Sequence, residues 1–325
     1  MPTLADVAAL AAVSKATASR ALSREELVAP ETAARVRAAA EQLGFVPNRA
    51  ARQLARGRTG IIALVVPTLD NSFFTPIIDG AQSRAGEADL QLTVSVHSLD
   101  SPAATGAFTR LASQVDGFIV VAPRGPDDGV RAAGSLKPAV LVDREIEGMT
   151  SVVADTATAF GFLVSRLVDD GHDRIVYVGG PAGSWQDGQR SAAVAAAASG
   201  RAELTVLGPH PSTFAAGVAI ASAVRESGAT AVVPYATAIG LGLMFALAAE
   251  PAGRPVTVSS ERMVVESLAM RGVPAIDVDG AELGRKAADL LLARLAAGPR
   301  TPLPAERLRL PVPVRWPDLT EPLDA

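Results

Sequence analysis

From residue 60 onward, short apolar runs alternate with stretches long enough to form a helix. The runs consist mostly of Val, Ile, Leu and Ala, as is typical of strands buried on both faces of a sheet. They occupy residues 61–66, 90–96, 118–122, 139–142, 175–178, 204–207, 231–233 and 256–259. Strands that alternate with helices form parallel α/β sheets. Because seven or eight such units exceed one compact sheet, the sequence predicts two Rossmann-like lobes, with ligand bound at the carboxyl ends of the strands.

The composition fits helices packed on sheets and excludes several kinds of enzyme site. Apolar residues make up 49% of the 325 residues and aromatic residues only 4%, so Ala, Val, Leu and Ile must build the core. The chain has no Cys, which excludes disulfides, thiolate zinc sites and cysteine nucleophiles. Its histidines form no spaced metal or triad motif, and Gly240-Leu241-Gly242 lacks the third glycine of a dinucleotide fingerprint. We therefore expect no enzyme, no catalytic residue, no metal site and no cofactor.

The N-terminus has no feature of a secretion signal. No basic segment followed by an apolar segment begins the chain, and no uninterrupted apolar stretch approaches the ~20 residues that span a bilayer. We expect a cytoplasmic protein without a membrane partner.

Charge is unevenly distributed along the chain. Residues 1–59 hold nine Lys and Arg against five Asp and Glu, whereas the whole chain carries a net charge of −4. A basic N-terminal part on an acidic remainder indicates that the N-terminal part binds a polyanion.

Residues 1–46 have the signals of a small helical domain. Thr3 can cap a first helix over residues 4–11, and Ser14 can cap a second helix that reaches Leu22. Two short helices joined by a tight turn predict a helix-turn-helix. A third helix begins at Pro30 and stops before Gly44.

The second helix has one apolar and one basic side. Ala18, Ala21 and Leu22 can face inward, and the opposite side groups Lys15, Ala16, Ser19 and Arg20. A small, basic face fits the major groove of DNA, where a long cation can reach guanine or a phosphate. From the pattern alone, an ordinary solvated helix face is an equal alternative.

Residues 47–59 form a candidate hinge. The segment 49–56 is helical in composition but shorter than the ~12–15 residues that an isolated helix needs in water. We expect it to be disordered in the absence of DNA. A basic flexible linker is the alternative.

Three segments resemble the DNA-binding signature of the lactose/galactose repressor (LacI/GalR) family. They are Thr3-Leu4-Ala5-Asp6-Val7-Ala8, Val13-Ser14-Lys15-Ala16-Thr17-Ala18-Ser19-Arg20-Ala21-Leu22 and Leu43-Gly44-Phe45-Val46-Pro47-Asn48-Arg49-Ala50-Ala51-Arg52. The resemblance implies that Lys15 and Ala16 read operator bases and that Arg20 also reaches the groove. It gives phosphate-binding and capping roles to Thr17, Ser19 and Asn48. The full set of expected DNA-binding residues is Thr3, Ser14, Lys15, Ala16, Thr17, Ser19, Arg20, Asn48, Arg49, Ala51, Arg52 and Leu54.

The same resemblance assigns the hinge a role and shows two departures. In the family the hinge helices of a dimer fold only on the operator, and Leu54 here occupies the position of the leucine that enters the minor groove. An apolar wedge of this kind unstacks a base step and kinks the DNA. Ala12 replaces the usual turn glycine, and Ala29 replaces the usual serine before Pro30.

Residues 60–325 resemble the periplasmic-binding-protein-like core of the family. The resembling segments include Asn71-Ser72-Phe73-Phe74, Val142-Asp143-Arg144 and Gly171-His172-Asp173-Arg174. In that family the chain crosses between lobes three times, here near residues 157, 285 and 311. The implied lobes are residues 60–157 with 286–310, and residues 158–285 with 311–325.

Candidate effector-binding residues follow from the matching positions. They are Asp70, Asn71, Phe73, Phe74, Asp143, Trp185, Arg190 and Arg262. The family's usual ligand-holding residues are replaced by Ala236-Thr237 and by Ser260-Glu261-Arg262-Met263. Two hypotheses stay open. Arg190 and Arg262 converge on an anion such as a sugar phosphate or carboxylate, or Arg262 pairs with a nearby carboxylate and the core binds no small molecule.

The predicted function is transcription regulation. A homodimer, or a tetramer, would bind a palindromic operator in double-stranded DNA with one helix-turn-helix per half-site. A small-molecule effector would close the lobes and change the spacing of the hinges. The alternatives from other classes are an α/β enzyme and a solute-binding protein.

Overall fold

A computed structural model describes residues 2–23, 27–45, 58–248, 254–270, 272–298 and 303–317. The chain divides into two compact units, Met1–Gly60 and Ile61–Ala325, which we call the headpiece and the core. Residues 47–57 of the predicted hinge, 47–59, lie outside the described residues. None of the helices in the described ranges is long and apolar enough to cross a membrane.

The headpiece contains the three helices that the sequence predicts. They are α1 (Leu4–Leu10), α2 (Lys15–Ser23) and α3 (Pro30–Gln42). Small buried side chains join them, because Val7, Ala18, Ala33 and Val36 are fully buried in one cluster. The capping box at Thr3 is confirmed: the Thr3 N–H donates to Asp6 Oδ2 at 2.7 Å, and the Asp6 N–H donates to Thr3 Oγ1 at 3.4 Å.

The turn between α1 and α2 ends the first helix with a left-handed residue. Ala12 has φ +53°, its N–H donates to the Ala9 carbonyl at 3.1 Å, and the Val13 N–H donates to the Ala8 carbonyl at 2.9 Å. This is the Schellman pattern, which satisfies the last carbonyls of α1. Glycine is the residue that normally takes such a φ, so Ala12 occupies the turn with backbone strain.

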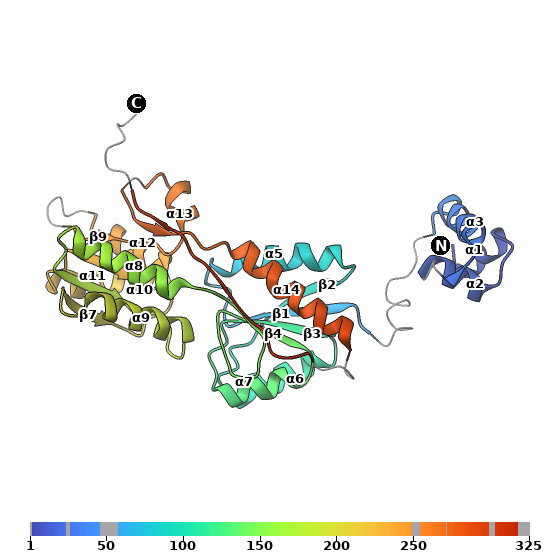
Figure 1. The fold of residues 1–325 in the computed structure, drawn as a ribbon, viewed down its shortest axis with the longest axis horizontal. Coiled ribbons are helices and arrows are strands. Elements are labelled where there is room, and N and C mark those ends of the chain that lie inside the picture. Colours follow the sequence, from blue (N-terminus) through green and yellow to red (C-terminus); the bar gives the residue numbers. More distant parts are fainter. Residues whose placement is uncertain are drawn as a thin grey trace, which may run out of the picture. The chain divides into compact units, whose positions relative to one another are not determined.

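The first lobe of the core is a six-stranded, all-parallel sheet with strand order β11-β5-β4-β3-β1-β2. Its strands are β1 (Ile61–Val66), β2 (Gln91–Val96), β3 (Gly117–Val121), β4 (Ala139–Val142), β5 (Ser151–Ala154) and β11 (Arg307–Leu310). Helices α5 (Phe74–Glu87) and α14 (Gly280–Ala297) run side by side on one face (Figure 1). Helices α6 (Pro102–Ala112) and α7 (Asp127–Gly134) cover the other face.

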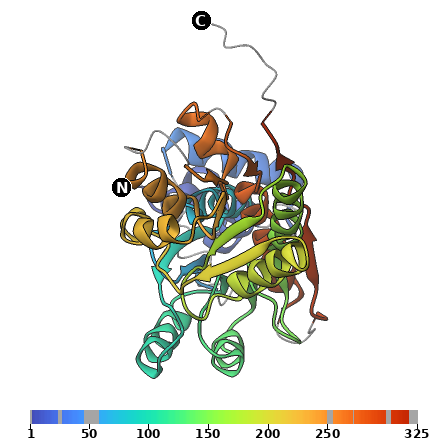
Figure 2. The same cartoon turned by 90° about the vertical axis from the view of Figure 1, so that its left-hand side faces the viewer.

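The second lobe has a four-stranded parallel sheet with order β7-β6-β8-β9. Its strands are β6 (Arg174–Val178), β7 (Glu203–Leu207), β8 (Ala231–Pro234) and β9 (Val256–Thr257). Helices α8 (Thr156–Asp169) and α9 (Trp185–Ala198) pack on one face. Helices α10 (Phe214–Ala219), α11 (Ala221–Glu226) and α12 (Thr237–Ala246) pack on the opposite face, as the turned view shows (Figure 2). The remaining elements are α13 (Arg262–Ser267) and an antiparallel pair, β10 (Ala275–Ile276) with β12 (Val314–Arg315).

The predicted fold class is confirmed, but the sequence misses several short strands. Strand β11 reads Arg-Leu-Arg-Leu and lies at the edge of its sheet, so only alternate residues are partly buried and no apolar run appears. Strand β5, with four residues, and strands β10 and β12, with two residues each, are also missed. The run predicted at 256–259 is shorter than expected: β9 has two residues, and Ser259 forms only an isolated bridge to Ala275.

The chain crosses between the lobes three times in the core. The first crossing is at Asp155, between β5 and α8, and the third is at residues 311–313, between β11 and β12. The second was expected near 285, but α14 already begins at Gly280, where the Asp279 side chain caps it by accepting from the Glu282 N–H at 2.8 Å. Residues 280–285 therefore belong to the first lobe.

Candidate functional site

Helix α2 presents the small, basic face that the sequence predicts. The helix is capped by Ser14, whose Oγ accepts from the Thr17 N–H at 3.0 Å. Ala18 is fully buried and Ala21 is nearly so, which fixes the side of α2 that faces the other helices. The opposite side exposes Lys15, Ala16, Ser19 and Arg20. The orientation of the predicted DNA-reading residues is therefore outward.

Three of the expected DNA-binding residues have hydroxyls that take part in caps. The Ser14 and Thr17 hydroxyls are 2.8 Å apart, and the Thr3 hydroxyl donates to Asp6 Oδ2 at 2.8 Å. Hydrogen bonds from the Thr3 backbone and side chain lower the pKa of Asp6. These contacts fix the N-termini of α1 and α2. Asn48, Arg49, Ala51, Arg52 and Leu54 lie outside the described residues.

Five of the eight predicted effector residues meet in one small cavity between the lobes, which we call the inner pocket. Its lining consists of Asn71, Phe73, Phe74, Ala122, Asp143, Gln186, Arg190, Tyr235, Ala236, Ser260 and Glu261, around a volume of about 20 Å³. A single water molecule needs on the order of 10–15 Å³ of such volume. The side chains of the protein therefore fill this position almost completely.

Arg190 is held inside the protein by partners on several sides. Its Nε donates to Thr156 Oγ1 at 2.9 Å, and one terminal nitrogen donates to the Tyr235 carbonyl at 2.7 Å. Its guanidinium lies 4.9 Å from the ring centre of Phe160 and 4.7 Å from that of Tyr235. Only 5% of Arg190 is exposed. This arrangement uses much of the hydrogen-bonding capacity that a ligand would otherwise engage.

Asp143 connects the two lobes through a buried hydrogen-bond network. It follows β4 of the first lobe, and its Oδ1 accepts from Gln186 Nε2 of the second lobe at 2.9 Å and from the Ala154 N–H at 3.1 Å. Burial raises the pKa of Asp143, and the hydrogen bonds and the charge of Arg190 oppose this rise. Burial also raises the pKa of Glu261. Burial thus disfavours the charged forms of two acids that interact electrostatically with Arg190.

Arg262 and Trp185 line neither of the two interlobe pockets described here. Arg262 pairs with Glu266 at 3.1 Å and with Asp277 at 3.3 Å. Trp185 is the half-buried first residue of α9. Arg262 thus pairs with nearby carboxylates, as one of the two hypotheses expects, and it does not line the pocket that Arg190 lines.

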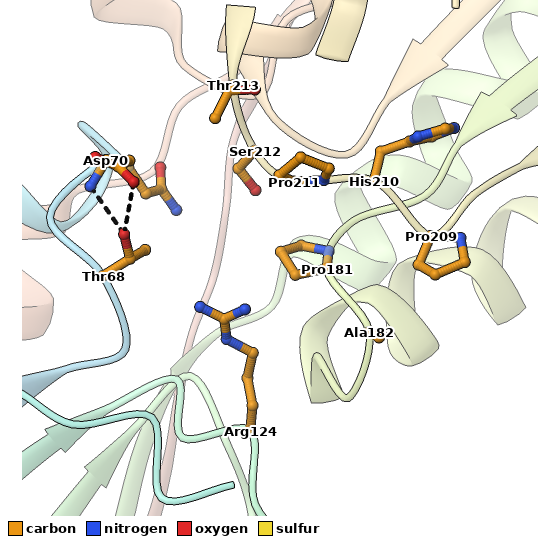
Figure 3. A pocket seen from close by; sticks show the side chains of 11 residues that line it. Thr68, Asp70, Arg124, Pro181, Ala182, Pro209, His210, Pro211, Ser212 and Thr213 are labelled. Atoms are coloured by element: carbon orange, nitrogen blue, oxygen red, sulfur yellow. Dashed lines mark hydrogen bonds between the residues drawn. The ribbon is translucent and has the colours of Figure 1, made fainter. Parts of the chain in front are cut away.

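A larger cavity, the outer pocket, opens beside the inner one (Figure 3). Its volume is about 420 Å³, and it is lined by Thr68, Asp70, Asn71, Arg124, Pro181, Ala182, Pro209, His210, Pro211, Ser212 and Thr213. This volume is within the usual range of ligand pockets, ~300–1,000 Å³. Asp70 and Asn71 are predicted residues, whereas Arg124, His210 and Ser212 are not. The available signal was position, because Arg124 and Ser212 follow the strands β3 and β7, and ligands of open α/β sheets bind there.

Two family models match the chain. One, described as "Bacterial regulatory proteins, lacI family", matches residues 3–48. The other, described as "Periplasmic binding proteins and sugar binding domain of LacI family", matches residues 59–309, more than half of the chain. The chain belongs to the LacI family of bacterial regulatory proteins. The headpiece of this LacI-family chain thus carries the first match, and its core the second.

Two curated relatives of this LacI-family chain are regulators of sugar genes by name. The maltose regulon regulatory protein MalI of Escherichia coli (strain K12) is 32% identical over 194 residues, which are 58% of this chain and 56% of MalI. The sucrose operon repressor of Klebsiella pneumoniae is 34% identical over 185 residues, 55% of each chain. The chain spans about half the length of the curated relatives it matches.

Solved LacI-family structures share the fold. The lac repressor dimer bound to operator and the anti-inducer ONPF has a TM-score of 0.80 at 24% identity, covering 96% of this chain and 97% of that one. The complex of the transcriptional regulator CelR with cellobiose has a TM-score of 0.70 at 24% identity, covering 98% and 99%. At this identity the likeness concerns the fold alone.

Proposed function

We propose that this chain is a sequence-specific DNA-binding transcription repressor that acts in the cytoplasm and binds a palindromic operator as a dimer. The observation that carries the proposal is the exposed face of α2, where Lys15, Ala16 and Arg20 stand on a helix capped by Ser14. An α-helix fits the major groove of B-DNA, and the second helix of a helix-turn-helix reads base edges there. The similarity to the sucrose operon repressor supports the same function.

Each residue of this face has a distinct task in the proposal. Lys15 donates to guanine O6 or N7, Arg20 reaches the groove or a phosphate, and Ala16 is small enough to let the helix approach the bases. The basic charge of residues 1–59 supplies the non-specific attraction to DNA, which falls with salt. Leu54 acts as the minor-groove wedge of the hinge.

Regulation by a small molecule between the lobes completes the proposal. A ligand that closes the lobes shifts the DNA-bound state only by its differential affinity, and a shift from 1:99 to 99:1 needs about 10⁴-fold. The second candidate is the same repressor with a core that binds no effector. The nearly filled inner pocket favours that candidate, and the outer pocket opposes it.

A mobility-shift assay on the DNA upstream of the chain's own gene tests the DNA-binding function. Wild-type protein should form a complex that resists random competitor DNA and weakens steeply with salt. Lys15→Ala should lose about 1–3 kcal/mol on the operator, the worth of one good base contact, and much less on random DNA.

Arg35→Ala is the matched control, because Arg35 is exposed on α3 and outside the reading face of α2. This variant should weaken operator and random DNA by equal factors or leave both unchanged. The proposal fails if Lys15→Ala weakens both DNAs equally, since Lys15 would then contribute only charge.

A further inference from the structure

The outer pocket is assembled from loops of both lobes at the carboxyl ends of parallel strands. Thr68, Asp70 and Asn71 follow β1, and Arg124 follows β3, all in the first lobe. Pro181 and Ala182 follow β6 of the second lobe, and residues 209–213 lead from β7 to α10. A molecule bound here contacts both lobes, so its binding energy depends on how the lobes are arranged.

The lobes also approach each other closely beside this pocket. A Cβ added to Gly183 in the second lobe would lie 2.9 Å from the Arg124 carbonyl oxygen of the first lobe. Gly183 has φ +75°, a conformation that glycine adopts without strain. The two lobes are therefore in direct contact at the wall of the outer pocket. A molecule bound in this pocket can change that contact and with it the arrangement of the lobes.

Ser212 supplies a buried hydroxyl without a partner in this pocket. Only 8% of Ser212 is exposed, and its Oγ has no hydrogen-bond partner among the described residues. Figure 3 shows its side chain directed toward the space between Asp70 and Arg124. A buried hydroxyl that makes no hydrogen bond destabilises the protein, and such groups in native structures call for an explanation. A ligand oxygen at this place would accept the Ser212 proton.

Arg124 extends into the same space, on the opposite side from Ser212. Its guanidinium has no hydrogen bond or ion pair within the described part of the chain, whereas the other arginines near the cleft are engaged. Arg144 donates to the Pro123 and Gly125 carbonyls at 2.6 and 2.7 Å. Arg190 is held by Thr156 and Tyr235, and Arg262 by its carboxylates. Arg124 is therefore the guanidinium available for bidentate binding of an oxyanion.

The other walls indicate what surrounds the anionic group. Asp70 is exposed, and the Thr68 hydroxyl donates to Asp70 Oδ2 at 3.2 Å. This bond holds the carboxylate at the pocket edge, where it can accept from ligand hydroxyls. Pro181 and Pro211 line the pocket with apolar ring edges. The lining contains no aromatic ring other than the imidazole of His210. These walls suit a small molecule with several hydroxyls better than a flat aromatic one.

We propose that the outer pocket is the effector site and that it binds a small hydroxylated oxyanion, a sugar phosphate or a sugar acid. Arg124 binds the anionic group, Ser212 donates a hydrogen bond to it, and Asp70 accepts from the hydroxyls. The inference rests on the proposed function, because it makes this molecule the signal that the repressor answers. It moves the effector away from Arg190 and Arg262, which the sequence singles out.

Isothermal titration of the full chain with glucose 6-phosphate, gluconate and glucose tests the ligand class. Glucose 6-phosphate and gluconate separate the two sources of negative charge, and glucose is the neutral control. At least one of the two anions should bind at millimolar concentration or below, and glucose should bind more weakly by roughly 10-fold or more, the worth of a charged hydrogen bond.

Variants then test the residues. Arg124→Gln should weaken anion binding roughly 10- to 100-fold, whereas Arg262→Gln, which removes an ion-paired guanidinium outside the pocket, should leave binding unchanged. Ser212→Ala should weaken the anion several-fold and raise the thermal midpoint of the ligand-free protein, because it removes an unsatisfied donor. If Ser212 had only a structural role, Ser212→Ala would not lower the affinity for the anion and raise the thermal midpoint of the ligand-free protein at the same time.

The same preparations are assayed for DNA binding without ligand, which separates the two proposals. Absence of DNA binding overturns the proposed function. Three results with intact DNA binding would overturn the proposed oxyanion site. Neither anion binds at 10 mM, or glucose binds as well as glucose 6-phosphate, or Arg124→Gln binds the anion like wild type.

Discussion

Replacement of Ala12 by glycine should stabilise the headpiece. Ala12 has φ +53°, and a non-glycine residue in this left-handed conformation costs about 1–2 kcal/mol. Glycine removes that cost but loses about 0.5–1 kcal/mol more backbone entropy on folding. The difference predicts a gain of about 0.5–1 kcal/mol in the free energy of unfolding of the headpiece.

Ala9→Gly is the matched control for Ala12→Gly. Ala9 is exposed in the right-handed helix α1, so the same substitution should destabilise the headpiece by about 1 kcal/mol. Hydrogen exchange of the buried amides of Val7 and Val36 in the full chain measures both effects. Ala12→Gly should slow exchange about two- to fivefold, and Ala9→Gly should accelerate it by a similar factor. Acceleration by both variants would refute the left-handed turn at Ala12.

Three further predictions concern the core and the hinge. Because burial raises the pKa of Asp143, its charged form is disfavoured in the fold, and wild type should lose stability relative to Asp143→Asn as the pH rises above about 4; a pH-independent difference in urea unfolding at pH 5 and 8 would contradict this. A Cβ on Gly80 would lie 2.0 Å from the Ala281 carbonyl oxygen, whereas one on Gly86 of the same helix meets nothing within 4 Å. Gly80→Ala should therefore cost about 1–3 kcal/mol of unfolding free energy and Gly86→Ala should be neutral or stabilising, and equal thermal midpoints would contradict the close α5–α14 contact. Leu54→Ala should weaken operator binding more than random-DNA binding in a mobility-shift assay, and equal losses on both DNAs would contradict the role of Leu54 as a minor-groove wedge.

Local signals were enough to predict the headpiece and the main strands. The caps at Thr3 and Ser14 depend on residues three positions apart, and the structure has both hydrogen bonds. The long apolar strands, such as β1 and β3, are buried along almost their whole length, and such burial produces an apolar run in any sequence. Strand β11 was not predicted, because it is an edge strand that alternates polar and apolar residues and so contains no apolar run.

The state of the interlobe cleft could not be predicted from the sequence. The resemblance to the family places Phe73, Phe74 and Arg190 at one site, and the structure has them in the inner pocket. Whether their side chains leave room for a ligand depends on packing in three dimensions. Arg124 and Ser212 belong to no motif, and they become a candidate pair only when the loops after β3 and β7 meet across the cleft. Arg262 pairs with carboxylates, as one of the two hypotheses expects. Its partner Glu266 lies four residues further along the same helix and could be predicted, whereas Asp277 follows β10, a two-residue strand that the pattern does not reveal.

The most direct test measures the affinity of the full chain for two duplexes by fluorescence anisotropy at about 0.15 M salt. One duplex is the palindrome that the chain binds in the DNA upstream of its own gene, and the other has a random sequence. If the exposed side of α2 reads base edges, the palindrome should bind on the order of 10³-fold more tightly or better. Equal affinities for the two duplexes would contradict this account of the protein.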